Sequence, residues 1–204
     1  MPPIRRLFLK TALEPRLQQA HAGQRAVFFV DAAHFVLASF LGWMWCAVRR
    51  FVKAASGRQR YNVLGALNAV THEVIRVSNT TYINADTVCQ LLWRIAGLGL
   101  GMPITLVLDN ARYQHCRLVQ EVAAALDIEL LFLPSYSPNL NLIERLWKFV
   151  KKSVLNSRPQ NSFLEFRQSI DRCLDQLPTT HHAAMQTLMT AKFQTFENVS
   201  ILAA

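Results

Sequence analysis

Short apolar runs alternate with amphipathic segments in the second half of the chain. Ile104–Leu108 is a continuous apolar run that ends at Asp109, and Ile128–Leu133 is another that ends at Pro134. Short runs of this kind, rich in branched side chains and bounded by turn residues, are typical of buried strands. Val119–Leu126, between the two runs, has apolar residues at helical spacing. The pattern therefore predicts a strand, a helix and a second strand in this region.

The segment Ala26–Val48 is very apolar, and of its 23 residues only Asp31 and His34 ionise readily. A membrane span is the alternative that hydropathy suggests. An aspartate near the centre of a bilayer would cost about 2.5 to 3.5 kcal/mol, and the segment is dense in aromatic and branched residues. We therefore predict two buried strands, Ala26–Ala33 and Leu37–Val48, joined by a tight turn.

A hairpin and a helix connect these two regions. Tyr61–Asn68 and Glu73–Ser78 are runs of strand-forming residues separated by turn-prone residues, which predicts a hairpin. Ala85–Ala96 has helical spacing and is followed by Gly97. The predicted order is antiparallel strands first, then helices that alternate with parallel strands, in an α/β fold. The sequence leaves open whether Glu73–Ser78 extends the sheet or forms a small flap.

A further helix is predicted after the turn sequence Ser135–Pro138. Asn139 or Asn141 is placed to cap this helix. One apolar face would consist of Ile143, Leu146, Phe149 and Val150, and an adjoining face of Glu144, Trp147, Lys148 and Lys151. The spacing thus predicts that Glu144 lies beside a basic strip and outside the core.

Asp109 and Glu144 are the first candidates for chemistry, and 34 residues, 110–143, separate them. Asp109 follows a predicted strand, and ligands bind at the carboxyl ends of strands in open α/β sheets. Both residues also have ordinary structural interpretations. Asp109 suits a turn at the end of a strand. Glu144 suits a hydrogen bond to the helix cap or an ion pair with Lys148.

The composition indicates a folded, basic protein. The 204 residues are enough for one domain with a sizeable core, and 51% of them are hydrophobic. Lysine and arginine outnumber aspartate and glutamate by 22 to 13, giving a formal net charge of +9, which favours a polyanionic partner. The four cysteines form no C-x-x-C pair, and no histidines stand at zinc-finger spacing. We therefore expect reduced cysteines in a cytosolic protein, without a zinc site or a disulfide framework.

The two ends of the chain differ from its middle. Residues 1–24 are mixed polar and basic and lack the pattern of a secretory signal, so we expect a connector or helix there. Phe163–Leu177 has helical spacing and is expected to pack across the sheet. We predict a main domain at residues 25–178 and a helix with a loose tail at 179–204.

Three blocks of sequence carry a family resemblance: VFFVDAAHF, LVLDNARYQHC and LPSYSPNLNLIERLWKFVKK. They resemble the catalytic blocks of bacterial insertion-sequence transposases of the Tc/mariner superfamily, whose catalytic triad is two aspartates and a glutamate (DDE). In that family the second aspartate and the glutamate are separated as Asp109 and Glu144 are here. The resemblance spans about 27–152 and implies a triad of Asp31, Asp109 and Glu144. Positions that depart from the family pattern are Ala32, Asn139 and Leu142.

The resemblance implies a ribonuclease H-like fold: a mixed five-stranded sheet, three antiparallel strands and then parallel strands, flanked by helices. It implies that Asp31, Asp109 and Glu144 hold Mg²⁺ or Mn²⁺, two ions per site, since crowded carboxylates need cations and these ions prefer oxygen ligands. The implied activity is metal-dependent DNA strand cleavage and strand transfer during insertion-sequence transposition, by a protein of the bacterial cytoplasm associated with the nucleoid. The implied partners are transposon-end and target DNA and a helix-turn-helix DNA-binding module that is separate or missing, with a homodimer left open and no membrane.

Two other functions stay open from the sequence: a catalytically degenerate DNA-binding remnant of a transposase, and a ribonuclease H-like nuclease that does not act in transposition. Candidate DNA contacts are Asn110 and a set of basic residues: Arg49, Arg50, Lys53, Arg58, Arg60, Lys148, Lys151 and Lys152. Asn110 also suits a plain turn, and each basic residue also suits a solvated charge. His34 suits either a hydrogen bond near the site or a place in the core.

Overall fold

A mixed five-stranded sheet forms the centre of the described part of the chain. The structure is a computed structural model that describes residues 3–37, 59–135, 137–155 and 162–190. The strands lie in the order β3-β2-β1-β4-β5, and their bounds are Ala26–Leu37 (β1), Gln59–Asn68 (β2), Val74–Asn79 (β3), Ile104–Leu108 (β4) and Ile128–Phe132 (β5). β2 runs antiparallel to β1 and β3, whereas β4 runs parallel to β1 and β5. The mixed sheet predicted from the sequence is confirmed.

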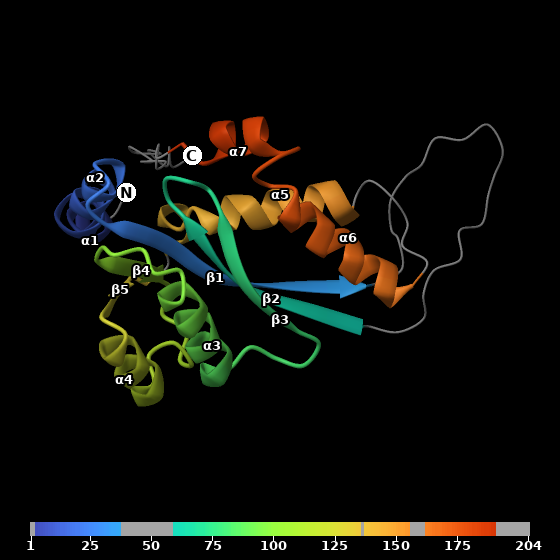
Figure 1. The fold of residues 1–204 in the computed structure, drawn as a ribbon, viewed down its shortest axis with the longest axis horizontal. Coiled ribbons are helices and arrows are strands. Elements are labelled where there is room, and N and C mark those ends of the chain that lie inside the picture. The colour runs from blue at the N-terminus through green and yellow to red at the C-terminus, as the bar shows by residue number, and fades with distance from the viewer. Residues whose placement is uncertain (1–2, 38–58, 136, 156–161, 191–204) are drawn as a thin grey trace, which may run out of the picture.

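Helices cover both faces of this sheet (Figure 1). α3 (Ala85–Ala96) and α4 (Arg117–Ala125) cover one face, while the other carries α5 (Ile143–Leu155), α6 (Phe163–Asp175) and α7 (His182–Leu188). The N-terminal helix packs on the α5 side and consists of α1 (Pro3–Phe8), a π-helix η1 (Leu9–Leu13) and α2 (Glu14–His21). A short 3₁₀ turn, η2 (Pro138–Leu140), precedes α5. Each helix predicted by apolar spacing is thus present; α3 has the predicted bounds, and the ends of the others shift by one to a few residues.

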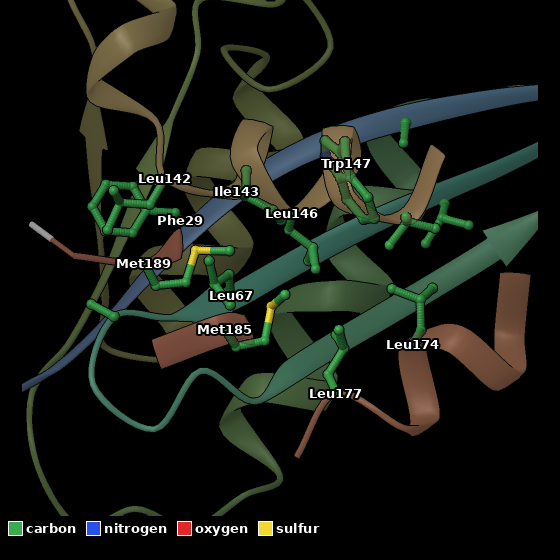
Figure 2. Packing of buried hydrophobic residues seen from close by; sticks show 14 of the residues in the cluster. Phe29, Leu67, Leu142, Ile143, Leu146, Trp147, Leu174, Leu177, Met185 and Met189 are labelled. Atoms are coloured by element: carbon green, nitrogen blue, oxygen red, sulfur yellow. The ribbon is translucent and has the colours of Figure 1, made fainter. Parts of the chain in front are cut away.

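The alternation of side chains on β1 divides the core into two layers. Val27, Phe29 and Phe35 pack with α5 and α6 in one apolar cluster, whereas Phe28 and Val30 pack with α3 in the other. Successive side chains of a strand point to opposite faces, so a strand covered on both faces is apolar at nearly every position. Each large side chain buried in this way stabilises the fold by about 1.5 to 3 kcal/mol. Figure 2 shows the cluster between α5 and the sheet.

β1 is one continuous strand, and the tight turn predicted between Ala33 and Leu37 is wrong. Ten consecutive pairs with β2, from Phe28 opposite Asn68 to Leu37 opposite Gln59, keep its backbone extended. The apolar run alone did not show where β1 ends, because its antiparallel partner lies more than twenty residues further along the chain. The rest of the second predicted strand, residues 38–48, lies outside the described residues.

The predicted hairpin is β2 and β3, and it belongs to the main sheet. β3 pairs with β2 at the edge of the sheet, which settles the choice between an extension and a separate flap. No helix within the described ranges is long and apolar enough to cross a membrane.

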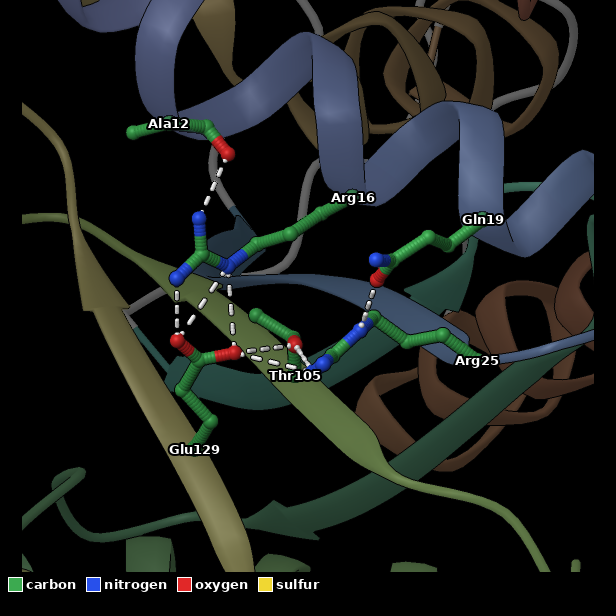
Figure 3. Close-up of polar contacts among 6 residues, drawn as sticks. All are labelled: Ala12, Arg16, Gln19, Arg25, Thr105 and Glu129. Atoms are coloured by element: carbon green, nitrogen blue, oxygen red, sulfur yellow. Dashed lines mark hydrogen bonds and ion pairs between the residues drawn. The ribbon is translucent and has the colours of Figure 1, made fainter.

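Charges around Glu129 join the N-terminal helix to the sheet (Figure 3). Arg16 on α2 forms an ion pair with Glu129 on β5, with Nε 3.0 Å from Oε2. Nη1 of Arg25 lies 3.0 Å from the same oxygen, and Thr105 Oγ1 donates to it at 2.7 Å. The hydrogen bond from Arg16 is the main reason that the pKa of Glu129 falls to about 2, although partial burial opposes it. This network fixes α2 against β4 and β5.

Candidate active site

Strand register brings Asp31 and Asp109 together. The parallel pairing of β1 with β4 matches Phe29 with Val107, and two residues further along each strand stand Asp31 and Asp109. Side chains two residues apart share a face of the sheet, and Phe29 and Val107 both pack in the cluster on the α5 side. Both aspartates therefore face α5, close to the point where β4 ends.

Buried residues before α5 fix Glu144 near these aspartates. Asn141 donates from Nδ2 to the carbonyl oxygen of Val30 at 3.1 Å, and this bond is buried. Val30 directly precedes Asp31, so the start of α5 is tied to β1 at the position of the first aspartate. Of the two residues predicted to cap this helix, Asn139 or Asn141, the side chain of Asn141 does not do so: its Nδ2 donates to the sheet, and its Oδ1 accepts no hydrogen bond among the described residues. Glu144 lies in the first turn of α5.

The three predicted catalytic carboxylates line one pocket of about 370 Å³. Asp31 comes from the middle of β1, Asp109 from the end of β4 and Glu144 from α5. The rest of the wall is mostly polar and neutral and consists of Asn110, Ala111, Leu133, Pro134, Ser135, Ser137 and Asn141. Residues that are up to 113 positions apart in the chain are therefore neighbours in space, as the sequence predicted.

A second hollow of about 260 Å³ adjoins the same carboxylates. Asp31 and Glu144 line both hollows, so they form the boundary between them. The second hollow differs in charge, because Lys148 and Lys151 reach it from successive turns of α5. Ala32, Ala33, His34 and Trp147 complete its wall.

The acidic site concentrates negative charge in a partly dehydrated place. Burial raises the pKa of Asp31 to about 7, and repulsion from Asp109 and Glu144 adds to this effect, while the backbone N–H of Ala32 opposes it. Burial, with repulsion from Asp109, also raises the pKa of Glu144, although two lysines oppose the change. Burial and the two nearby aspartates raise the pKa of Tyr113 to about 12. Burial and mutual repulsion thus disfavour further negative charge here, and a cation would relieve the repulsion.

The donor atoms at this site suit a hard divalent cation. The pocket presents carboxylate oxygens, and Oδ1 of Asn141 is buried without a hydrogen-bond partner among the described residues. Mg²⁺ and Mn²⁺ prefer such oxygen ligands and usually keep several waters. In the described ranges, no three His, Cys, Asp or Glu side chains lie close enough together to hold one ion. A divalent ion in this pocket would therefore need water and phosphate oxygens as ligands beside the carboxylates.

The predicted DNA contacts are only partly within reach of this site. Lys148 and Lys151 are exposed and line the second hollow, and Lys152 and Arg60 are exposed elsewhere on the surface. Asn110 lines the first pocket, where Nδ2 donates to the carbonyl oxygen of Leu133 and Oδ1 lies 2.9 Å from Nε2 of His115. The remaining candidates, Arg49, Arg50, Lys53 and Arg58, lie outside the described residues.

His34 is exposed at the second hollow and is not a core residue. Its Nδ1 lies 2.7 Å from Oδ1 of Asn62, which is fully buried. Nδ2 of Asn62 donates to Asn79 Oδ1 and to the carbonyl oxygen of Thr81, which fixes the orientation of the amide. His34 must therefore donate from Nδ1, and Nε2 is left for the hollow.

Trp147 is the residue at this site that the sequence placed wrongly. Helical spacing put it on the polar side of α5, yet it is only 3% exposed and packs in the core. Its ring lies against Gly65 on β2, where an added Cβ would stand 2.8 Å from Cη2. A glycine inside a strand marks a close approach of another group, and this was the available signal.

The sequence comparison with protein families identifies one match. The family model described as DDE superfamily endonuclease matches residues 27–167, which include all three carboxylates of the pocket. No curated protein sequence matches significantly.

Solved structures of transposases and integrases share the fold of this chain. The Mos1 strand transfer complex superposes with a TM-score of 0.59 at 15% identity, over 95% of this chain and 62% of that chain. The catalytic domain of Mos1 mariner transposase gives 0.57 at 14% identity, over 95% of this chain and 94% of that chain. The HTLV-2 integrase catalytic core domain, in complex with magnesium, gives 0.50 at 14% identity, over 78% and 88%. These matches confirm the ribonuclease H-like fold. The chain spans less than two thirds of the Mos1 chain in the strand transfer complex.

Proposed function

The chain belongs to the DDE superfamily of endonucleases, and on this premise we propose that it is the catalytic domain of a transposase, which cuts DNA and transfers a DNA strand with divalent metal ions. The observation that carries the proposal is the convergence of Asp31, Asp109 and Glu144 on one pocket. Two of these carboxylates have a raised pKa. Perturbed acids that meet in a cleft are typical of catalytic sites.

Asp31, Asp109 and Glu144 are the proposed catalytic residues and metal ligands. The proposed cofactor is Mg²⁺ or Mn²⁺, two ions per site, and structures of the Mos1 paired end complex with Mg and with Mn support this choice. When bound, such ions activate a water or a 3′-hydroxyl and stabilise the leaving oxygen of an in-line displacement at phosphorus. The three carboxylates would hold and orient the ions, and the protein itself would form no covalent bond to DNA.

The two hollows suggest a path for the DNA strand. A strand that runs from the acidic pocket into the hollow with Lys148 and Lys151 would cross the boundary formed by Asp31 and Glu144. One phosphate would then lie over the carboxylates, and the next would lie beside the lysines. Contacts of this kind position DNA without reading its sequence. Further proposed DNA contacts are Asn110, Arg49, Arg50, Lys53, Arg58, Arg60 and Lys152.

The proposed partners are transposon-end DNA, target DNA and a helix-turn-helix DNA-binding module. The Mos1 relatives were solved as a strand transfer complex and as a complex with paired transposon ends, which supports DNA and paired assembly as partners here. Assembly of two copies of this chain is part of the same proposal. The catalytic domain is proposed to occupy residues 25–178, between a connector at 1–24 and a tail at 179–204. The proposed location is the bacterial cytoplasm, at the nucleoid.

The activity is tested with one substitution in the pocket and one matched control. Asp109→Asn removes the charge of a proposed metal ligand with little change of shape. Asp127→Asn makes the same change at an exposed residue between α4 and β5, where φ is 53° and asparagine is well tolerated. The full chain, supplied with its DNA-binding module, is incubated with DNA that carries the inverted repeats flanking its own coding region.

Wild type and Asp127→Asn are expected to cut and join this DNA only when Mg²⁺ or Mn²⁺ is present. Asp109→Asn is expected to lose both reactions while it still folds and binds DNA. Metal-dependent cutting by Asp109→Asn at the wild-type rate would overturn the site assignment. Cutting of arbitrary DNA without joining would indicate a nuclease outside transposition, and DNA binding by wild type without any reaction would indicate a degenerate remnant.

A further inference from the structure

Gly65 stands opposite the first proposed catalytic aspartate in the sheet, and its missing side chain leaves room for a tryptophan. In the pairing of β1 with β2, Gly65 stands opposite Asp31. A Cβ on Gly65 would lie 2.8 Å and 2.9 Å from Cη2 and Cζ2 of Trp147 and 3.2 Å from Cδ1 of Ile143. Two of these distances are too short for any real side chain, so α5 approaches the sheet as closely as it does only because this position is glycine. Glycine inside a strand is less favourable than alanine, and here it permits the close approach of α5.

The indole of Trp147 is held between two elements. Its ring lies against the backbone of β2 at Gly65, and Phe35 on β1 meets it edge-on with ring centroids 6.2 Å apart and an angle of 81° between the planes. The residue is 3% exposed. Figure 2 shows Trp147 on α5, one turn beyond Ile143, above the strands of the sheet. A side chain with this environment has one rotamer available, and its polar atom has a fixed position.

The polar atom of this buried ring is unpaired within the part of the chain that the structure describes. Nε1 of Trp147 is buried and makes no hydrogen bond among the described residues. A buried N–H without a partner is costly, so packing alone does not explain why the ring at this position carries one. Trp147 lines the same hollow as Asp31 and Glu144. Its N–H is close enough to Asp31 to favour the charged carboxylate and so to lower the pKa of Asp31, against the larger effect of burial.

We propose that Trp147 is a positioning residue for the acidic site, and that Gly65 sets its distance from the sheet. When ions are bound, Nε1–H donates to one oxygen of Asp31, and the other oxygen is directed into the pocket. Such contacts commonly form or tighten only when a site is filled. This inference rests on the proposed function of Asp31 as a metal ligand. Trp147 would then orient a metal ligand in addition to packing in the core.

The test compares two substitutions that alter the same packed ring. Trp147→Phe keeps an aromatic ring but removes the N–H, whereas Phe35→Leu loosens the packing around the indole and removes no polar atom. Both are expected to lower the thermal midpoint of the metal-free protein. Mn²⁺ affinity is measured by calorimetry on the full chain. Trp147→Phe is expected to weaken it about 10- to 100-fold, as loss of a group that orients a metal ligand does, and Phe35→Leu by about twofold at most.

A second variant keeps the test decisive if Trp147→Phe does not fold. Gly65→Ala displaces the indole without changing its chemistry, and it is expected to weaken Mn²⁺ binding in the same way as Trp147→Phe. Equal Mn²⁺ affinities for wild type, Trp147→Phe and Gly65→Ala would overturn the inference and leave the proposed function intact. Failure of the wild type itself to bind Mn²⁺ would overturn the proposed function and, with it, the inference.

Discussion

Asp31 is expected to destabilise the metal-free fold, because the same burial that suits a cation disfavours its own charge. Burial above all, together with Asp109 and Glu144, raises its pKa to about 7 from an ordinary value of 3.8. This difference corresponds to a free energy on the order of 4 kcal/mol. The destabilisation itself is smaller, because a partly buried carboxylate keeps some contact with water and its neighbours relax.

The sign of the effect follows from proton linkage. Between pH 3.8 and about 7 the folded protein keeps a proton on Asp31 that the unfolded chain has already lost. The free energy of unfolding therefore falls as pH rises through this range, and the stability present at low pH is lost above the folded pKa. Asp31→Asn removes the titrating group. Without metal, this variant is expected to be more stable than wild type at pH 8, by about 1 to 3 kcal/mol after relaxation, and close to it at pH 4.

Urea unfolding between pH 4 and pH 8, followed by circular dichroism in the presence of a chelator, measures this difference. Asp127→Asn, an exposed acid outside the pocket, serves as the control and is expected to follow the wild type. Addition of Mn²⁺ at pH 8 is expected to raise the stability of wild type and to leave Asp31→Asn unchanged. An Asp31→Asn protein that is no more stable than wild type at pH 8, or a difference that is the same at every pH, would refute the reasoning.

The remaining predictions concern DNA and the N-terminal helix. The double variant Lys148→Ala, Lys151→Ala is expected to weaken DNA binding and to reduce the slope of log affinity against log salt concentration by about 2. The control Arg117→Ala, whose side chain is 91% exposed on α4, is expected to keep the wild-type slope. Equal slopes for wild type, the double variant and Arg117→Ala would show that the two lysines do not contact DNA. Glu129→Gln is expected to lower the free energy of unfolding at pH 7 by about 1 kcal/mol, a value reduced for the solvent exposure of the Arg16 pair. Because the pKa of Glu129 is about 2, the loss of stability in Glu129→Gln should be complete above pH 4.5 and should fade as pH falls through 2. Urea titrations that show the same loss at pH 2 and at pH 7 would contradict this pH dependence.

Elements with strong local signals were predicted closely from the sequence. The helix Ala85–Ala96 has the predicted bounds, because Asn84 caps its start and Gly97 follows its end. The strand Ile104–Leu108 is also as predicted, because Pro103 and Asp109 mark its limits. The resemblance of three sequence blocks to a known family then indicated which acidic residues meet. The register of β1 with β4 brings two of these, Asp31 and Asp109, together.

Features that depend on distant partners were not predictable in the same way. Trp147 follows helical spacing toward the polar side of α5, yet a glycine more than eighty residues earlier lets it enter the core. Asparagine is a common helix-capping residue, but the side-chain amide of Asn141 donates to the carbonyl oxygen of Val30, on a strand over a hundred residues away. The end of β1 could not be located from the apolar run either, because it depends on pairing with β2. These outcomes depend on tertiary contacts, which local pattern and propensity do not encode.

Asp31, Asp109 and Glu144 are proposed to hold divalent ions together at the edge where β1, β4 and α5 meet. The most direct measurement is the anomalous diffraction of Mn²⁺ in crystals of the wild-type protein. Anomalous peaks are expected in the pocket, each within bonding distance of an oxygen of at least one of the three carboxylates. Peaks that lie elsewhere on the protein, with an empty pocket at saturating Mn²⁺, would contradict it.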